Sequence, residues 1–132
     1  MSAGASPPPR PLILVIEDDR LHAGYLKDLL EAHEYTVVTA GGGVEGLKLL
    51  HEHPPSLVLT DILMPEVDGI ECIRSIRELP NPPPIIAFSG GGRVDAEMYL
   101  KLAIQLGAQQ VFRKPIPDEA LCAAIGRLLH AA

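Results

Sequence analysis

Five short and largely apolar runs recur along the chain, at residues 12–16, 36–39, 57–60, 85–88 and 110–112. Most are continuous rather than alternating, which is typical of strands buried on both faces of a parallel sheet. A longer segment with apolar residues at helical spacing follows each run. Five strands that alternate with five helices predict an α/β fold: a doubly wound parallel sheet of strand order 2-1-3-4-5 with helices on both faces.

Start and stop signals delimit the predicted helices. Asp19 is placed to cap a helix over about 20–32. Asp68 and Glu71 have the spacing of a capping box for the third helix, and Gly107 is suited to end the fourth. These signals agree with the apolar spacing, so the predicted elements rest on two kinds of evidence.

The apolar positions of the helices predict the faces that pack on the sheet. In the first helix these are Leu21, Tyr25, Leu29 and Ala32, and in the second they are Val44, Leu47 and Leu50, with His51 as a further candidate. The fourth helix, from about Val94 to Leu106, is apolar around much of its circumference. That breadth indicates either a wide buried face or an outer surface for a partner or a second copy of the chain.

Composition narrows the class of protein. A chain of 132 residues, 47% of them hydrophobic, can form one domain with a buried core. We expect the proline-rich residues 1–11 to form a flexible leader and residues 12–132 to form the domain. No run of eighteen apolar residues exists, so we expect no membrane span. The net charge of −6 has no compensating basic stripe, which argues against nucleic-acid binding.

The two cysteines carry a prediction about environment. Cys72 and Cys122 fall within helical apolar patterns and lack the spacing of a metal site. We therefore expect buried free thiols, which fits a protein of the reducing cytoplasm.

Polar side chains follow four of the five predicted strands. They are Glu17 and Asp18 after the first strand, Asp61 at the third, Ser89 at the fourth and Lys114 after the fifth. In a sheet of order 2-1-3-4-5 these carboxyl ends converge beside the switch point between the first and third strands, where open α/β sheets bind ligands. The sequence therefore predicts one site built from all five residues.

The chemistry of this set favours phosphoryl transfer. One pair of carboxylates 4 Å apart repels by about 4 kcal/mol at an effective dielectric near 20, so the three acidic groups need a cation. Oxygen-only ligands favour Mg²⁺ over zinc, and Lys114 adds a fixed positive charge. Mg²⁺ and lysine neutralise phosphoryl oxygens, while Asp61 can attack phosphorus to give an aspartyl-phosphate. The Ser89 hydroxyl can hydrogen-bond a phosphoryl oxygen.

A family resemblance rests on this ordered set. Glu17-Asp18, the stretch Asp61-Ile62-Leu63-Met64-Pro65 followed by Asp68-Gly69, Ser89, and Lys114-Pro115 together resemble the receiver domain of two-component response regulators. The resemblance covers about residues 12–131 and implies a flavodoxin-like receiver fold. Because the sequence ends at Ala132, we expect a stand-alone, single-domain receiver or a piece of a longer protein.

The resemblance implies a role for each residue. Asp61 would accept a phosphoryl group from a histidine kinase or a histidine phosphotransfer protein. The ligands of Mg²⁺ would be Glu17, Asp18, Asp61 and the backbone carbonyl of Leu63. Lys114 would contact the phosphoryl group, Ser89 would move toward it, and the peptide before Pro115 would be cis. We expect such a protein to be a signalling phosphoacceptor rather than an enzyme, and to act through an unknown downstream protein.

The sequence departs from the family pattern at two places. The family usually has Tyr or Phe three residues before the lysine, where this chain has Val111. Phe112 is one residue later and would face the other side of the sheet, so we do not give it the switch role. The run Gly90-Gly91-Gly92 leaves the loop after Ser89 free to reshape. Since neither Leu63 nor Gly91 can orient water, we expect slow hydrolysis of the phosphorylated form.

Other functions fit parts of the pattern. An aspartyl-phosphate hydrolase of the haloacid dehalogenase type would carry a second aspartate two residues after the nucleophile, where this chain has Leu63. A degenerate receiver that serves as a phosphorylation-independent adaptor would explain Val111, but not the intact acidic, hydroxyl and lysine set. A flavodoxin-like cofactor binder is disfavoured, because the acidic pocket would repel a flavin phosphate.

Overall fold

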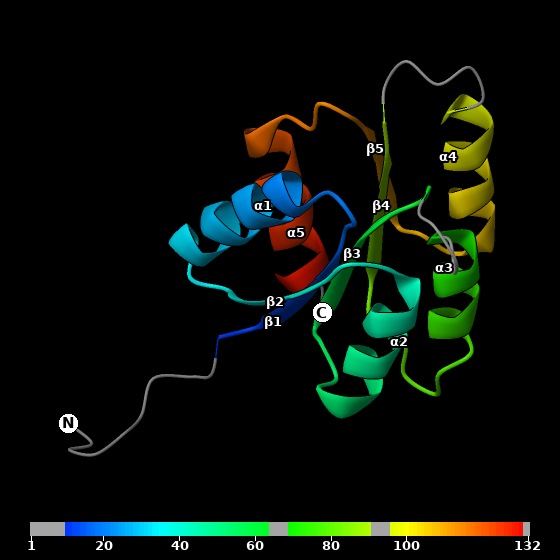
Figure 1. Cartoon of the computed structure of the whole chain (residues 1–132), viewed down its shortest axis with the longest axis horizontal. Helices are drawn as coiled ribbons and strands as arrows, with labels where there is room; N and C mark the ends of the chain where they lie inside the picture. Colours follow the sequence, from blue (N-terminus) through cyan, green and yellow to red (C-terminus); the bar gives the residue numbers. More distant parts are fainter. Residues whose placement is uncertain (1–9, 64–68, 91–95, 131–132) are drawn as a thin grey trace.

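A five-stranded parallel sheet forms the centre of the molecule (Figure 1). The computed structural model describes residues 10–63, 69–90 and 96–130. The strands are β1 (Leu12–Ile16), β2 (Thr36–Ala40), β3 (Leu57–Asp61), β4 (Ile85–Ser89) and β5 (Gln110–Arg113). They lie side by side in the order β2-β1-β3-β4-β5, which confirms the predicted topology. This order puts the carboxyl ends of β1 and β3 next to each other.

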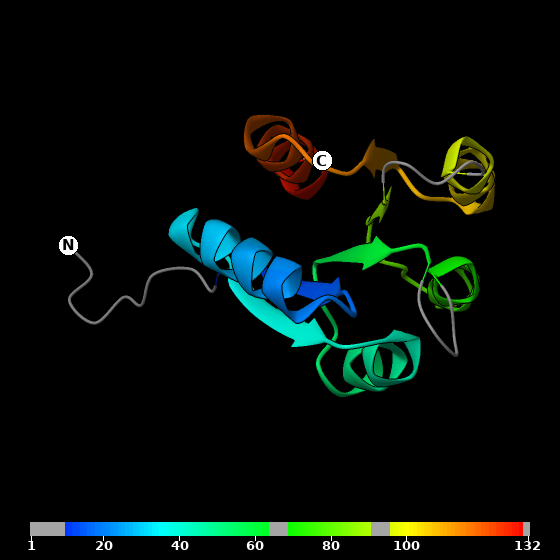
Figure 2. The same cartoon turned by 45° about the horizontal axis from the view of Figure 1, so that its top comes forward.

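Helices cover both faces of the sheet. They are α1 (Arg20–Ala32), α2 (Gly43–Glu52), α3 (Gly69–Arg77), α4 (Ala96–Leu106) and α5 (Asp118–His130). Figure 2 shows α1 and α5 on one side of the sheet and α2, α3 and α4 on the other. Successive residues of a strand point to opposite faces, so Leu14 packs toward α2 to α4 and Val15 toward α1 and α5. The continuous apolar runs in the sequence therefore reflect two cores, one on each face.

No helix in the described ranges combines the length and the apolar character needed to cross a membrane.

The predicted inner face of α1 is wrong. Leu21 is 87% exposed and Tyr25 is 51% exposed, whereas Ala23, Leu26 and Leu30 are buried. Both sets of residues have the spacing of a buried helix face, so the pattern alone does not choose between them. Docking on the sheet fixes the rotation, and it leaves Leu21 and Tyr25 on the outer surface; Ala32 is exposed and Leu29 is half-buried.

The inner face of α2 differs from the prediction in part. Leu50 is buried and Leu47 half-buried as expected, but Val44 and His51 are exposed. Gly43 and Gly46 take their place against the sheet. A Cβ atom on Gly46 would lie 2.6 Å from Ile16 Cδ1, so the glycine lets the helix approach β1 closely. Glycine carries no hydrophobic signal, which is why the sequence pattern missed this contact.

The local signals around the helices fared better. The Asp19 side chain accepts hydrogen bonds from the amides of Leu21 (3.0 Å) and His22 (3.4 Å), so the predicted cap of α1 is confirmed. Gly107 ends α4 with a φ of +120°, a conformation that suits glycine. Cys72 is buried and Cys122 is half-buried, and neither forms a disulfide.

Several predictions concern residues outside the described ranges. They are most of the leader 1–11, the cap at Asp68, the start of the fourth helix at Val94, and the glycines Gly91 and Gly92.

Candidate phosphoryl-transfer site

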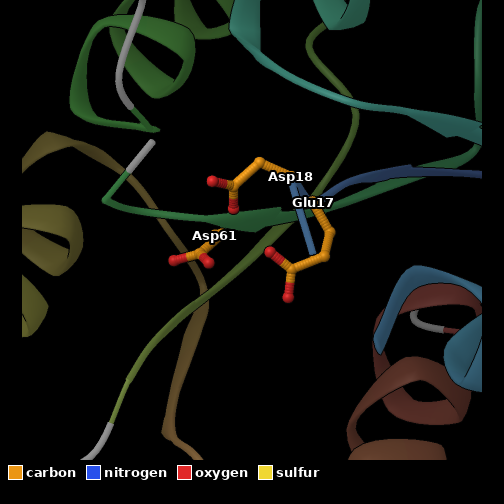
Figure 3. Close-up of side chains that lie close together, drawn as sticks. All are labelled: Glu17, Asp18 and Asp61. Carbon is orange, nitrogen blue, oxygen red and sulfur yellow. The ribbon is translucent and has the colours of Figure 1, made fainter. Parts of the chain in front are cut away.

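Three carboxylates meet at the carboxyl ends of β1 and β3 (Figure 3). Glu17 and Asp18 directly follow β1, and Asp61 is the last residue of β3. One carboxylate oxygen from each residue lies within 4.8 Å of those of the other two. Glu17 is 1% exposed and Asp61 is 5% exposed, while Asp18 faces solvent. The sheet therefore brings together the acidic residues that the sequence analysis assigned to one site.

Backbone hydrogen bonds hold the two strand ends in place. The amide of Glu17 donates to the Ala40 carbonyl at 2.9 Å, which extends the pairing of β1 with β2. The chain then turns back at Gly69, whose amide donates to the Ile62 carbonyl at 2.7 Å. A Cβ atom on Gly69 would lie 2.2 Å from the Asp61 carbonyl oxygen, so a glycine is needed where α3 begins. The position of Asp61 thus depends on a close backbone contact.

Lys114 supplies the positive charge at the centre of the site. Its Nζ donates hydrogen bonds to Glu17 Oε1 (2.8 Å) and to Asp61 Oδ2 (3.1 Å). The ammonium also lies over the ring of Phe88, 5.2 Å from its centroid. The Lys114 amide donates to the Ser89 carbonyl at 2.8 Å, and the peptide between Lys114 and Pro115 is cis. The lysine therefore links strands β1, β3 and β4.

The electrostatics of the cluster shift two ionisation equilibria. Burial and, after it, the neighbouring Glu17 raise the pKa of Asp61 from 3.8 to about 6, although Lys114 opposes the shift. Burial lowers the pKa of Lys114, but its hydrogen bonds and charge interactions with Glu17 and Asp61 more than offset this, so that pKa lies above its ordinary value. One ammonium thus compensates the two buried carboxylates incompletely, and the site favours a further cation.

The raised pKa predicts how stability depends on pH when divalent cations are removed. The folded pKa of Asp61, about 6, lies above the ordinary value of 3.8, so the folded state binds the proton more tightly than the unfolded state. The resulting stabilisation is present below the ordinary pKa and is lost as the pH rises through about 6. A shift of this size corresponds to at most roughly 3 kcal/mol. Urea unfolding in chelator should show this loss, and Asp61→Asn should flatten it; equal pH slopes in both proteins would contradict the prediction.

Ser89 has a buried hydroxyl that needs a partner. The residue ends β4 and is fully buried, and within the described part of the chain its Oγ forms no hydrogen bond. A buried hydroxyl without a partner costs free energy, so this atom is suited to bind a polar atom that a ligand brings. This observation fits the proposed phosphoryl contact.

Leu63 contacts Asp61 through its backbone amide. The Leu63 amide donates to Asp61 Oδ1 at 3.2 Å, which helps to orient the carboxylate. The carbonyl as a metal ligand stays a prediction.

His22 is a site residue that the sequence analysis did not single out. Its Nδ1 donates a hydrogen bond to Glu17 Oε1, and its ring packs edge-to-face on Phe88, with centroids 5.6 Å apart. The signal that could have found it is a histidine in the first turn of the helix that directly follows the acidic pair.

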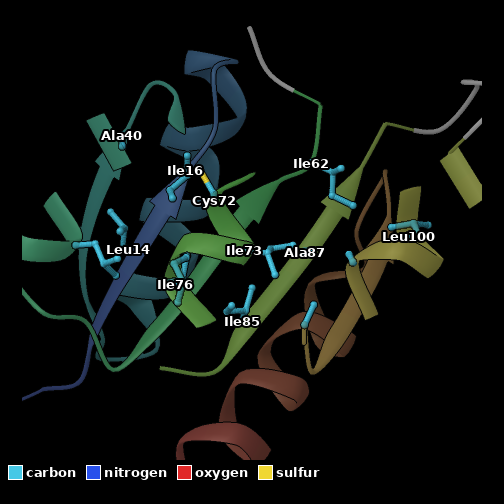
Figure 4. Close-up of a cluster of buried hydrophobic side chains, with 14 residues drawn as sticks. Leu14, Ile16, Ala40, Ile62, Cys72, Ile73, Ile76, Ile85, Ala87 and Leu100 are labelled. Carbon is cyan, nitrogen blue, oxygen red and sulfur yellow. The ribbon is translucent and has the colours of Figure 1, made fainter. Parts of the chain in front are cut away.

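Val111 and Phe112 face opposite sides of the sheet. Val111 occupies the position where the family usually has the switch aromatic, and Phe112 follows it. Figure 4 shows the cluster of buried apolar side chains that includes Leu14 and Ile73. Val111 packs against this cluster, whereas Phe112 packs on the cluster beneath α1 and α5. The prediction that Phe112 faces away from the usual switch position is therefore confirmed.

An open hollow of about 650 Å³ adjoins the site. Its walls include His22, Tyr25, Gly90, Lys114 and Ile116. The Tyr25 hydroxyl donates to the Asp118 carboxylate, which joins the middle of α1 to the start of α5. The hollow thus gives a molecule from solvent access to the lysine.

The donor set fits Mg²⁺. The three side chains offer carboxylate oxygens, which hard divalent cations prefer, and solvent reaches the cluster at Asp18. The buried negative charge that Lys114 leaves uncompensated is a second reason for a cation to bind here.

Comparisons with known proteins agree with this geometry. The model of the response regulator receiver domain family matches residues 13–126. A CpxR homolog of Haemophilus influenzae, named a transcriptional regulatory protein, is 35% identical over 118 residues, which is 89% of this chain and 50% of the relative. CpxR of Escherichia coli K12 is 33% identical over 118 residues, 89% of this chain and 49% of the relative. The chain therefore spans about half the length of these curated relatives.

Solved structures show the same fold. A response regulator receiver domain protein from Clostridium thermocellum superposes with a TM-score of 0.82 at 31% identity, covering 90% of this chain and 94% of that one. The family match extends over most of the chain, and the relatives share both sequence and fold with it. This chain belongs to the response regulator receiver domain family.

Proposed function

We propose that Asp61 accepts a phosphoryl group from a phosphohistidine of a histidine kinase or a histidine phosphotransfer protein. The family supports a phosphoacceptor role in two-component signalling. The observation that carries the assignment of Asp61 is its contact with Lys114, 3.1 Å from Asp61 Oδ2, beside a cluster of three carboxylates. Glu17 is also buried and also contacts Lys114, but its Oε1 is shared between Lys114 and His22, and the family resemblance assigns the phosphoacceptor role to the position of Asp61.

The reaction follows from the positions of the groups. A carboxylate oxygen of Asp61 attacks phosphorus, the bond between phosphorus and the donor imidazole nitrogen breaks, and the imidazole leaves with the electron pair. Glu17, Asp18, Asp61 and the Leu63 carbonyl would hold Mg²⁺, which when bound neutralises charge on the phosphoryl oxygens. Lys114 donates to a phosphoryl oxygen, and the buried Ser89 hydroxyl gains the partner that it needs.

The donor protein approaches, in this proposal, over the first half of α1. Leu21 and Tyr25 are exposed there, and the hollow of about 650 Å³ lies between Tyr25 and Lys114. Exposed apolar side chains beside an open path to the reacting carboxylate are suited to bind a partner.

Output, in turn, uses the outer side of α4. Leu100 and Ala103 are buried against the sheet, whereas Met98 and Ile104 are 59% and 53% exposed. The apolar breadth of this helix therefore divides into a buried face and an outer surface, and we assign the outer surface to a downstream protein or a second copy of the chain. We expect no nucleic-acid contact from these residues and no catalysis on other substrates; the relatives named transcriptional regulatory proteins extend beyond the matched part.

The decisive experiment uses a small phosphodonor. Incubation with Mg²⁺ and acetyl phosphate, followed by intact mass spectrometry, should add one phosphoryl group to the wild-type chain. Asp61→Asn and an excess of chelator should each abolish the addition, and the matched control Asp28→Asn, an exposed residue of α1, should be labelled normally. An unmodified wild-type protein would favour the phosphorylation-independent adaptor instead.

The phosphorylated form is expected to be long-lived. The Leu63 side chain, two residues after Asp61, is half-buried and apolar, so it does not orient water for attack on the acyl phosphate. After the donor is removed, intact mass should report a half-life of many minutes, and Leu63→Asn should shorten it several-fold. A half-life of seconds in the wild-type protein would end this prediction.

A further inference from the structure

Glu17 is a buried carboxylate held by side chains from two distant parts of the chain, the first turn of α1 and the residue that follows β5. Its Oε1 accepts hydrogen bonds from Lys114 Nζ at 2.8 Å and from His22 Nδ1. Its Oε2 lies 3.4 Å from the Asp19 amide, a long and weak contact. Because a buried carboxylate that loses its partners is costly, both the lysine and the histidine stabilise its position.

Lys114 forms a second hydrogen bond, to Asp61. Its Nζ also bonds Asp61 Oδ2 at 3.1 Å, and the reaction proposed above adds a phosphoryl group at that carboxylate. A phosphoryl group brings close to two further negative charges, so it competes with Glu17 for the same ammonium. For the His22 Nδ1–H, Glu17 is the one hydrogen-bond acceptor among the residues that the structure describes.

His22 is held so that it can keep this contact. Its ring stands edge-to-face on Phe88 at an interplanar angle of 89°, and Phe88 is fully buried. Its amide donates to the Asp19 cap at 3.4 Å. The same Phe88 ring receives the Lys114 ammonium on its face, so one aromatic side chain supports both donors to Glu17.

We infer that His22 is a positioning residue, which holds the Glu17 carboxylate at the site while Lys114 is drawn to the phosphoryl group. The inference rests on the proposed function and adds a residue to it. It has a distinctive consequence: the phosphorylated state depends on His22 more than the unphosphorylated state does, because only then do the added charges of a phosphoryl group compete with Glu17 for the lysine.

The test compares two affinities in the same protein. Beryllofluoride, which mimics an acyl phosphate, is titrated in saturating Mg²⁺ and followed by fluorine NMR, while Mg²⁺ alone is titrated by calorimetry. His22→Ala should weaken beryllofluoride binding about tenfold or more, the size of effect seen when a supporting hydrogen bond to a metal ligand is lost. The affinity for Mg²⁺ alone should change less, because without the phosphoryl mimic Lys114 still holds Glu17.

A pair of conservative variants separates the hydrogen bond from the packing of the ring. The His22→Asn amide nitrogen lies close to the position of Nδ1 and should restore most of the binding, whereas His22→Gln carries its amide one bond further and should restore less. His33→Ala, which removes an exposed histidine from just beyond the other end of α1, should match the wild type. Urea unfolding establishes that each variant is folded.

The possible results separate support for the inference from its failure and from failure of the proposed function. A proton NMR signal from the His22 Nδ1–H that persists when beryllofluoride binds, together with rescue by Asn, supports the inference. Equal beryllofluoride affinity in His22→Ala and wild type overturns it, as does equal loss in the Ala and Asn variants. If the wild-type protein binds no beryllofluoride in Mg²⁺, the proposed function fails and the inference fails with it.

Discussion

Lys114→Met is expected to lower the free energy of unfolding by about 3 kcal/mol at neutral pH in chelator, and to abolish phosphorylation by acetyl phosphate. The variant removes the ammonium from two buried carboxylates, 2.8 Å and 3.1 Å away, and a buried charge left without its partner is strongly destabilising. Part of the loss should return on adding Mg²⁺, because a divalent cation can replace some of the missing charge. It should also shrink at acidic pH, where a carboxyl group of the pair takes up a proton.

A matched surface lysine provides the control. Lys27 pairs with Glu31 one turn along α1 at 2.9 Å, and both side chains are more than 40% exposed, at 43% and 42%. Exposed pairs of this kind contribute about 0.5 kcal/mol or less, so Lys27→Met should leave stability almost unchanged. Urea unfolding of both variants, with and without Mg²⁺, measures the difference. Equal losses would mean that Lys114 is not compensating buried charge.

Gly69→Ala is expected to be strongly destabilising, because the added methyl group would meet backbone atoms. The added methyl would lie 2.2 Å from the Asp61 carbonyl oxygen and 2.5 Å from the Ile62 Cα, both backbone atoms that cannot turn aside. Relief requires α3 to move away from β3, and we expect a cost of about 3 kcal/mol, typical of severe overpacking. The same movement displaces Asp61, so the rate of phosphorylation should fall as well.

Gly24→Ala is the control for this substitution. Gly24 lies within α1, and a Cβ atom there would meet no atom beyond its chain neighbours and the surrounding helix backbone within 4 Å. Replacing a glycine inside a helix by alanine stabilises it by up to about 1 kcal/mol, so this variant should gain stability. Thermal and urea unfolding of the two variants should therefore change in opposite directions. A Gly69→Ala protein as stable as wild type would show that the start of α3 adapts easily.

The sequence was enough to predict that the strand-end residues lie together, because the carboxyl ends of parallel strands all lie at the same edge of the sheet. Glu17, Asp61 and Lys114 follow apolar runs, and the strand order brings those ends to one edge of the sheet. The side-chain contacts inside the site were harder to predict from the sequence. His22 reaches Glu17 because α1 turns back across the end of β1, and a sequence pattern does not specify that angle.

The rotation of the helices was the weakest part of the prediction. In α1 two apolar stripes compete, one with Leu21 and Tyr25 and one with Leu26 and Leu30, and the second is buried. Periodicity identifies a stripe but not the element that will cover it, because that depends on packing between segments far apart in the chain. Tyr25, in the exposed stripe, lines the hollow beside Lys114. The residues wrongly predicted to be buried therefore belong to the surface that we assign to a partner.

The long sequence separation within the site has a consequence for how the chain acquires its structure during synthesis. Glu17 and Asp61 belong to the first half of the chain, but the lysine that bonds them follows β5, 97 and 53 residues later. A nascent chain that has emerged only as far as β4 carries the acidic residues without their ammonium, and segments near the amino terminus emerge first. The last strand therefore brings the neutralising charge, and divalent cations in the surroundings are suited to shield the incomplete sheet until it arrives.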